Sequence, residues 1–213
     1  MIRPGTVFTL AAENPLVPGC TVSARVTDTI YHFSLAANTD ISAEVYPCPR
    51  LIVMAAGEME VYTGHERIWL LHARQCLITP TNTPMGMRSK AGAVYTEICL
   101  GRDTKMNEII KAGEAFRLAE LLPYQEGRIV NMDIIHEPKL KFVLMSFDKG
   151  TGLSEHAAPG EALIFALDGE GVIGYEGKEH PIKAGENFKF AKGGLHSVKA
   201  TERFKMALLL TLE

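Results

Sequence analysis

Two glycine-rich stretches in the second half of the chain decide the expected fold. Residues 150–171 read GTGLSEHAAPGEALIFALDGEG, and residues 184–196 read AGENFKFAKGGLH. In each stretch a short apolar run is bounded by glycine or proline, which is typical of a strand next to a tight turn. Each stretch also carries one histidine, His156 in the first and His196 in the second. The pattern predicts short strands with a polar site on them.

The rest of the chain extends the same pattern, with one exception. Apolar runs at residues 51–54, 142–145 and 206–210 are four or five residues long and predict further strands. Residues 107–122 instead place their apolar side chains at roughly helical spacing, with Asn107 as a candidate N-cap and Pro123 as a stop. We therefore expect one helix between two β-domains.

An internal repeat supports the two-domain interpretation. A shift of 112 residues aligns Leu51-Ile52-Val53 with Leu163-Ile164-Phe165 and Gly57-Glu58 with Gly169-Glu170. After a hairpin of different length the shift becomes 111 residues, and residues 79–85 align with residues 190–196. A repeat of this length is too long for a solenoid and suits one compact barrel. The sequence thus predicts a duplicated barrel.

The two quoted stretches resemble the two motifs of the cupin superfamily, in the wording of the small Cupin_2 barrels. The resemblance covers about residues 140–213 closely and reaches the first half through the repeat. It implies an all-β fold of two tandem cupin barrels (double-stranded β-helix, or jelly roll) joined by a short helical connector. The expected parts are an N-terminal barrel at residues 1–103, the connector at 104–128 and a C-terminal barrel at 129–213.

The resemblance also implies where a metal would bind. Metal-binding cupins supply two histidines and a carboxylate from the first motif and one histidine from the second, a set that suits Fe, Mn, Ni or Zn. Here Ser154 replaces the first histidine, whereas His156 and His196 are kept. The expected metal ligands in the C-terminal barrel are therefore His156, His196 and a carboxylate.

Two different residues can be assigned to the carboxylate position of the first motif. Counting forward from His156 reaches Glu161, but counting back from Gly169 reaches Ala162. A shift of one residue turns a strand side chain to the opposite face, so the two readings differ in chemistry. We take Glu161 as the candidate ligand, with Glu155 as an alternative.

A metal-free reading of the same residues stays open. His156 and His196 can line a pocket and form hydrogen bonds with each other, with water or with Ser154. Strand periodicity lets several apolar side chains surround them and form a cavity for a small, partly apolar ligand such as an aromatic acid or lactone. The same side chains can also fill a barrel that holds nothing. The expected pocket residues are Ser154, Met145, Phe165, Phe190 and Met206.

The equivalent positions in the first half carry no histidine: they are Ser42, Glu44, Arg50 and Met85. Glu44 and Arg50 are close enough in sequence to form an ion pair at the rim of the barrel. An arginine in a pocket can alternatively hold a ligand carboxylate through its two-pronged donor geometry. We expect the ion pair, with this half serving packing and dimerisation.

Composition and charge exclude some classes of binding partner. The chain has 213 residues and a net charge of −3, so no basic field attracts nucleic acid. No apolar run reaches the roughly 20 residues that span a bilayer, and the N-terminus lacks the layout of a signal peptide, so the expected location is the cytoplasm. Short barrels leave strand edges that favour pairing, and we expect a homodimer.

Three functions remain open from the sequence. The first is binding of a small molecule in the C-terminal barrel, with or without one divalent metal. The second is a metal-dependent enzyme of the dioxygenase, isomerase or lyase type that acts on a small oxygenated substrate. The third is a structural or accessory barrel without a ligand. The fold alone does not choose among them, because it hosts many chemistries.

Overall fold

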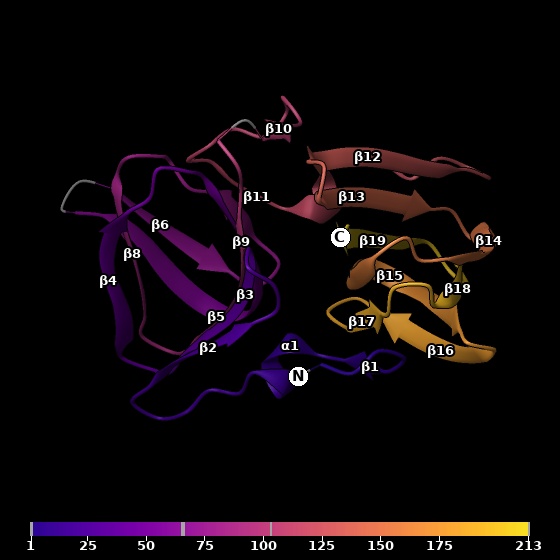
Figure 1. Ribbon diagram of the computed structural model, residues 1–213, viewed down its shortest axis with the longest axis horizontal. Helices are drawn as coiled ribbons and strands as arrows, with labels where there is room; N and C mark the ends of the chain where they lie inside the picture. Colours follow the sequence, from indigo (N-terminus) through magenta and orange to yellow (C-terminus); the bar gives the residue numbers. More distant parts are fainter. Residues whose placement is uncertain (1, 65–66, 103, 213) are drawn as a thin grey trace. The chain divides into compact units, whose positions relative to one another are not determined.

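The computed structural model describes residues 2–64, 67–102 and 104–212, and it forms two β-barrels (Figure 1). The C-terminal barrel comprises Met1–Thr9, Lys105–Asn107 and Leu118–Glu213, and the N-terminal barrel comprises Leu10–Thr104 and Glu108–Arg117. The two tandem barrels expected from the repeat are therefore present. The division differs from the expected boundaries in two places. Met1–Thr9 belong to the C-terminal barrel, and the expected connector at 104–128 is divided between the two barrels.

The C-terminal barrel is built around one long strand that takes part in two sheets. Strand β15 pairs with β17 and β19 along its first half, and with β16 and β18 along its second half. Strands β13, β12 and β10 continue one sheet beyond β19, β1 extends it beyond β17, and β14 extends the other beyond β18. The strands are β1 (Val7–Phe8), β10 (Lys105–Met106), β12 (Ile129–His136), β13 (Leu140–Phe147), β14 (Gly152–Ala157), β15 (Glu161–Tyr175), β16 (Lys178–Lys183), β17 (Asn187–Phe190), β18 (Leu195–Lys199) and β19 (Phe204–Thr211).

The N-terminal barrel repeats this topology around the long strand β5. Strand β5 pairs with β7 and β9 and then with β6 and β8, while β4 pairs with β8 and β3 with β9. The elements are α1 (Leu10–Glu13), β2 (Thr21–Arg25), β3 (Ile30–Leu35), β4 (Thr39–Val45), β5 (Arg50–Thr63), β6 (Arg67–His72), β7 (Cys76–Ile78), β8 (Pro84–Ser89), β9 (Ala93–Cys99) and β11 (Ala115–Phe116). The described residues contain no helix long and apolar enough to cross a membrane.

The two barrels share their irregularities as well as their strands. A β-bulge interrupts the pairing of β5 with β9 between Met54 and Ala56, and the same bulge in β15 lies between Ala166 and Asp168. A glycine with a left-handed backbone follows each bulge, Gly57 with φ 73° and Gly169 with φ 69°. All these positions correspond under the 112-residue shift, which confirms the repeat in three dimensions.

The helix expected over Asn107–Leu122 is wrong. The segment forms the short strand β11, which pairs with β7, and a single 3-10 turn, η1 (Leu118–Glu120). Gly113 has a left-handed backbone, φ 75°, that interrupts a helix, and its N–H donates to the carbonyl of Ile78 at 2.8 Å. The indole N–H of Trp69 donates to the carbonyl of Gly113, also at 2.8 Å. Hydrogen bonds to the barrel thus take the place of helical ones.

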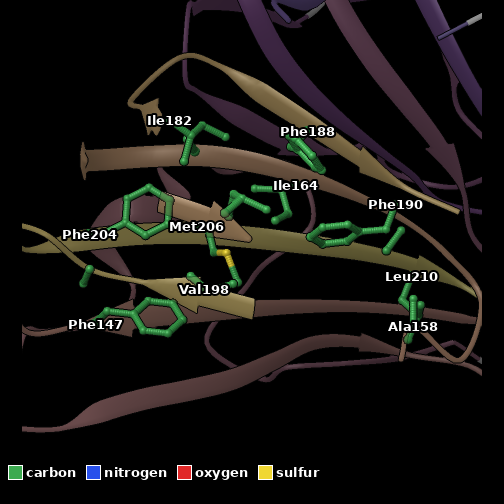
Figure 2. Close-up of a cluster of buried hydrophobic side chains, with 14 residues drawn as sticks. Phe147, Ala158, Ile164, Ile182, Phe188, Phe190, Val198, Phe204, Met206 and Leu210 are labelled. Carbon is green, nitrogen blue, oxygen red and sulfur yellow. The ribbon is translucent and has the colours of Figure 1, made fainter. Parts of the chain in front are cut away.

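Each barrel is filled by apolar side chains that alternate along its strands. In the C-terminal barrel, Ala162, Ile164 and Ala166 of β15 point inward and pack against a cluster of buried aromatic and aliphatic residues, as Figure 2 shows for Ile164, Phe188, Phe190 and Phe204. This burial of apolar surface is the main favourable contribution to folding. The interior is therefore a packed core.

Gly169→Ala tests the bulge glycine. A Cβ at this position would overlap the carbonyl oxygen of Arg203, and the backbone is left-handed, so we expect a loss of at least about 2 kcal/mol in the free energy of unfolding, measured by urea denaturation. Gly177→Ala is the matched control, because its φ is 74° but no described atom lies within 4 Å of the added Cβ. It is expected to cost only about 1 kcal/mol. Equal losses in the two variants would contradict the proposed role of the bulge.

Candidate functional site

The two motif histidines lie side by side at one end of the C-terminal barrel. His156 on β14 and His196 on β18 are directly paired across the two antiparallel strands. Their ring centroids are 4.2 Å apart, with the rings inclined at 51°. A register shift in β14 between Leu153 and His156 brings the two residues opposite each other. The structure thus brings together the two histidines that the sequence singled out.

The two imidazoles have different surroundings. The ring of His196 stacks on Phe190 at a centroid distance of 4.1 Å, and His196 is only 6% exposed. Phe190 in turn lies 5.5 Å from the ring of Tyr175, whose hydroxyl accepts a hydrogen bond from the N–H of Ala191 at 3.3 Å. His156 is exposed. The pair therefore extends from the apolar core, where His196 lies, to the surface, where His156 lies.

Backbone carbonyls orient both rings in the same way. Nδ1 of His156 lies 2.8 Å from the carbonyl oxygen of Ser154, and Nδ1 of His196 lies 3.2 Å from that of Gly194. A carbonyl oxygen only accepts, so Nδ1 carries the proton in each ring, and in the neutral ring Nε2 is an acceptor. Burial lowers the pKa of His196, and the neighbouring His156 lowers it further, although the carbonyl of Gly194 opposes this. His196 is therefore held in the neutral form.

Glu161 does not join the histidines. Ala162 is paired with Phe190 and belongs to the barrel core, so strand alternation turns Glu161 to the opposite face. Its carboxylate lies 2.9 Å from the ammonium group of Lys189. Counting back from Gly169 therefore gives the inward residue, and the expectation of Glu161 as a ligand beside the histidines is wrong.

The remaining donors do not complete a metal site. Among the described residues no group of three or more histidine, cysteine, aspartate or glutamate side chains is placed to hold a metal ion. Catalytic zinc sites use three protein ligands, and the chain offers two imidazole Nε2 atoms here. Ser154 and Glu155 are exposed on β14. The residues present do not fit a resident metal held by protein ligands alone.

Most of the expected pocket residues belong to the packed core. Phe190 and Met206 are buried in it, as Figure 2 shows, and Met145 packs against it. Phe165 lies on the other face of β15 and packs edge-on against Phe142, with ring centroids 6.1 Å apart. The expectation that Phe165 lines the cavity is therefore wrong, again because of strand alternation.

In the N-terminal barrel Glu44 and Met85 take the places of the two histidines, because they are paired across β4 and β8 in the same way. The expected ion pair between Glu44 and Arg50 is wrong. Arg50 pairs with Glu97 on β9, whereas Glu44 accepts a hydrogen bond from the hydroxyl of Tyr46 at 2.6 Å. Sequence separation favoured Glu44, but antiparallel pairing of β5 with β9 places Glu97 beside Arg50.

Comparisons with known proteins agree with this architecture. The Cupin_2 family, described as a cupin domain, matches residues 143–212. A Cupin 2 conserved barrel domain protein from Leptotrichia buccalis is 29% identical over 99% of this chain and 98% of its own, with a TM-score of 0.84. No curated protein matches the chain.

More distant solved structures share the fold alone. A salicylate 1,2-dioxygenase from Pseudaminobacter salicylatoxidans is 11% identical over 96% of this chain and 83% of its own, with a TM-score of 0.67. A putative glyoxylate induced protein from Pseudomonas aeruginosa is 13% identical over 97% of this chain and 87% of its own, with a TM-score of 0.59. The Cupin_2 model therefore matches residues 143–212 within the C-terminal barrel, and the whole chain has the fold of two tandem cupin barrels.

Proposed function

We propose that the protein binds a small organic molecule at the end of the C-terminal barrel, and that His156 and His196 contact it directly. The observation that carries the proposal is the pair of neighbouring imidazoles whose Nδ1 atoms are both bonded to backbone carbonyls. Two Nε2 acceptors are left for a ligand, and they favour one that donates hydrogen bonds, such as a hydroxyl compound.

The surroundings of the pair favour a partly apolar ligand. The ring of Phe190 lies against that of His196, with the centroids 4.1 Å apart, and gives the pair an apolar neighbour. Binding sites for small molecules commonly combine such apolar surface with a few polar groups that fix orientation. A hydroxylated aromatic compound meets both requirements.

A metal-dependent enzyme is the second candidate function. It is favoured by the orientation of the rings, because a metal-ligating histidine usually donates its other N–H to a carbonyl or carboxylate. Since the chain supplies two ligands there, a divalent ion would need further ligands from a chelating substrate. A dioxygenase, isomerase or lyase activity therefore requires that the metal and the substrate bind together. Formation of a homodimer and a cytoplasmic location stay predictions.

Substitution of either histidine tests the binding proposal. With 4-hydroxybenzyl alcohol and phenol as probes, followed by ligand-observed NMR, we expect His156→Ala and His196→Ala to weaken binding about tenfold, because each removes a hydrogen-bond acceptor and adjoining ring surface. His136→Ala is the matched control, since His136 is exposed on β12 and outside the pair. Unchanged affinity in both site variants would refute the proposal. Metal that purifies with the wild type in stoichiometric amount and is lost in both would favour the enzyme.

The pH dependence of stability tests the burial of His196. Its pKa in the folded chain lies below the ordinary value of 6.5, so the unfolded chain binds more protons at mildly acidic pH and stability falls as the pH drops below that value. We expect the wild type to lose more stability than His196→Gln when the pH is lowered from about 7.5 to about 5, as measured by urea denaturation. A wild-type profile identical to that of His196→Gln would show that the imidazole is not held neutral.

A further inference from the structure

A cluster of polar side chains lies at the corresponding end of the N-terminal barrel, for which the favoured expectation from the sequence was packing and dimerisation. It consists of Tyr46, Arg50, Tyr95 and Glu97, and we call it the Arg50 cluster. Arg50 begins β5, Tyr95 and Glu97 lie on β9, and Tyr46 follows β4. The cluster therefore gathers residues from three segments of one barrel.

The strand register places the cluster inside the barrel. Ile52 is paired with Glu97, and Met54 with Tyr95. Ile52, Met54 and Tyr95 all belong to the buried core of this barrel. Since side chains alternate along a strand, Arg50 and Glu97 point to the same inner face.

Within the cluster, Arg50 forms an ion pair with Glu97 and lies over the ring of Tyr46. The guanidinium of Arg50 pairs with the carboxylate of Glu97, whose side chain is 3% exposed, whereas that of Arg50 is 20% exposed. The guanidinium carbon lies 3.3 Å from the ring centroid of Tyr46. Arg50 is thus fixed in orientation and still reachable from solvent.

Tyr95 supplies an independent indication of a ligand. Its side chain is fully buried, and its hydroxyl has no hydrogen-bond partner among the described residues. Burial raises the pKa of this hydroxyl, and the neighbouring Glu97 raises it further, so it remains a proton donor. A buried donor without an acceptor costs free energy, which a ligand oxygen would remove.

The fold does not require these polar groups. In the C-terminal barrel the paired residues Ala162 and Leu210 correspond to Arg50 and Cys99, and the pair Ile164 and Leu208 corresponds to Ile52 and Glu97. Apolar side chains therefore pack the same places in the sister barrel. A buried ion pair contributes little net stability compared with such packing, so stability alone does not account for its presence.

We propose that the Arg50 cluster binds a small carboxylate that carries a second oxygen, of the 2-oxo acid or 2-hydroxy acid class. The carboxylate accepts from the planar guanidinium of Arg50, and the second oxygen accepts from the hydroxyl of Tyr95. Burial raises the pKa of Glu97, against the opposing effect of Arg50, so this carboxyl can take up a proton when an anion arrives. The site stays balanced in charge. It is independent of the histidine pair in the other barrel.

The experiment measures binding of pyruvate and lactate at millimolar concentration by saturation-transfer NMR, with lactamide as the uncharged control. We expect both acids to bind and lactamide not to bind. Arg50→Gln should weaken binding at least about tenfold, since it removes a charge-assisted contact, and Tyr95→Phe should weaken it about threefold to tenfold. His196→Ala should leave the binding of both acids unchanged, which separates this site from the one under "Proposed function".

Two further variants keep the test decisive. Arg88→Gln is the matched control, because Arg88 also pairs with a glutamate, Glu60, and lies over a tyrosine ring, Tyr62, at the edge of an open pocket in the same barrel. It should bind pyruvate as the wild type does. Arg50→Gln combined with Glu97→Gln avoids leaving Glu97 buried and unpaired, and should lose binding while remaining folded. Absence of binding to the wild type, equal weakening by Arg88→Gln, or full binding by Arg50→Gln or Tyr95→Phe would overturn the proposal.

Discussion

The left-handed glycine behind the β-bulge in each long strand is the constraint on which both barrels depend. A strand that pairs with one sheet along its first half and another along its second half has to turn between them, and the bulge at Ala166 and Asp168 provides the turn. Gly169 then brings its backbone close to Arg203, as Gly57 does to Gly92, where a side chain would not fit. Because the two barrels make the same turn at equivalent residues, their ends present equivalent positions. That equivalence allows the chemistry of the two ends to be compared residue by residue.

The equivalent ends of the two barrels carry different sets of polar groups on the same strand arrangement. The paired positions on β14 and β18 hold His156 and His196, and those on β4 and β8 hold Glu44 and Met85. Near the beginning of the long strand, the C-terminal barrel has the apolar Ala162, and the N-terminal barrel has the charged Arg50. The polar groups thus lie on β14 and β18 in the C-terminal barrel, and on β5 and β9 in the N-terminal barrel. The two barrels therefore share a backbone arrangement and differ in the polar side chains that it carries.

The resemblance to the cupin motifs implies that His156 and His196 lie together, and the sequence itself predicts the all-β fold and the duplication through its short apolar runs and its internal repeat. It fails where a result depends on contacts between distant strands. Glu161 and Ala162 differ by one residue, and the register against Phe190 decides which of them faces inward. The partner of Arg50 is 47 residues away on β9, whereas Glu44 was nearer in sequence. The helical spacing of residues 107–122 was outweighed by backbone bonds such as that from Gly113 to Ile78. Tyr95 carries no local signal at all, since a tyrosine in a strand usually packs in a core.

The histidine pair separates two features that a metal site normally combines, the orientation of the ligands and their number. The carbonyls of Ser154 and Gly194 fix both rings with Nε2 as the acceptor, which is the orientation that a metal requires. This orientation comes from backbone carbonyls, so it does not depend on the side chains of Ser154 and Ala162. The number of ligands comes from side chains, and it falls to two. Two oriented acceptors without a third ligand suit a hydrogen-bonding organic molecule better than a bare divalent ion, because an ion bound by two neutral imidazoles keeps most of its water shell. The number of possible ligands in this barrel therefore depends on side chains, whereas the orientation of the two rings depends on the backbone.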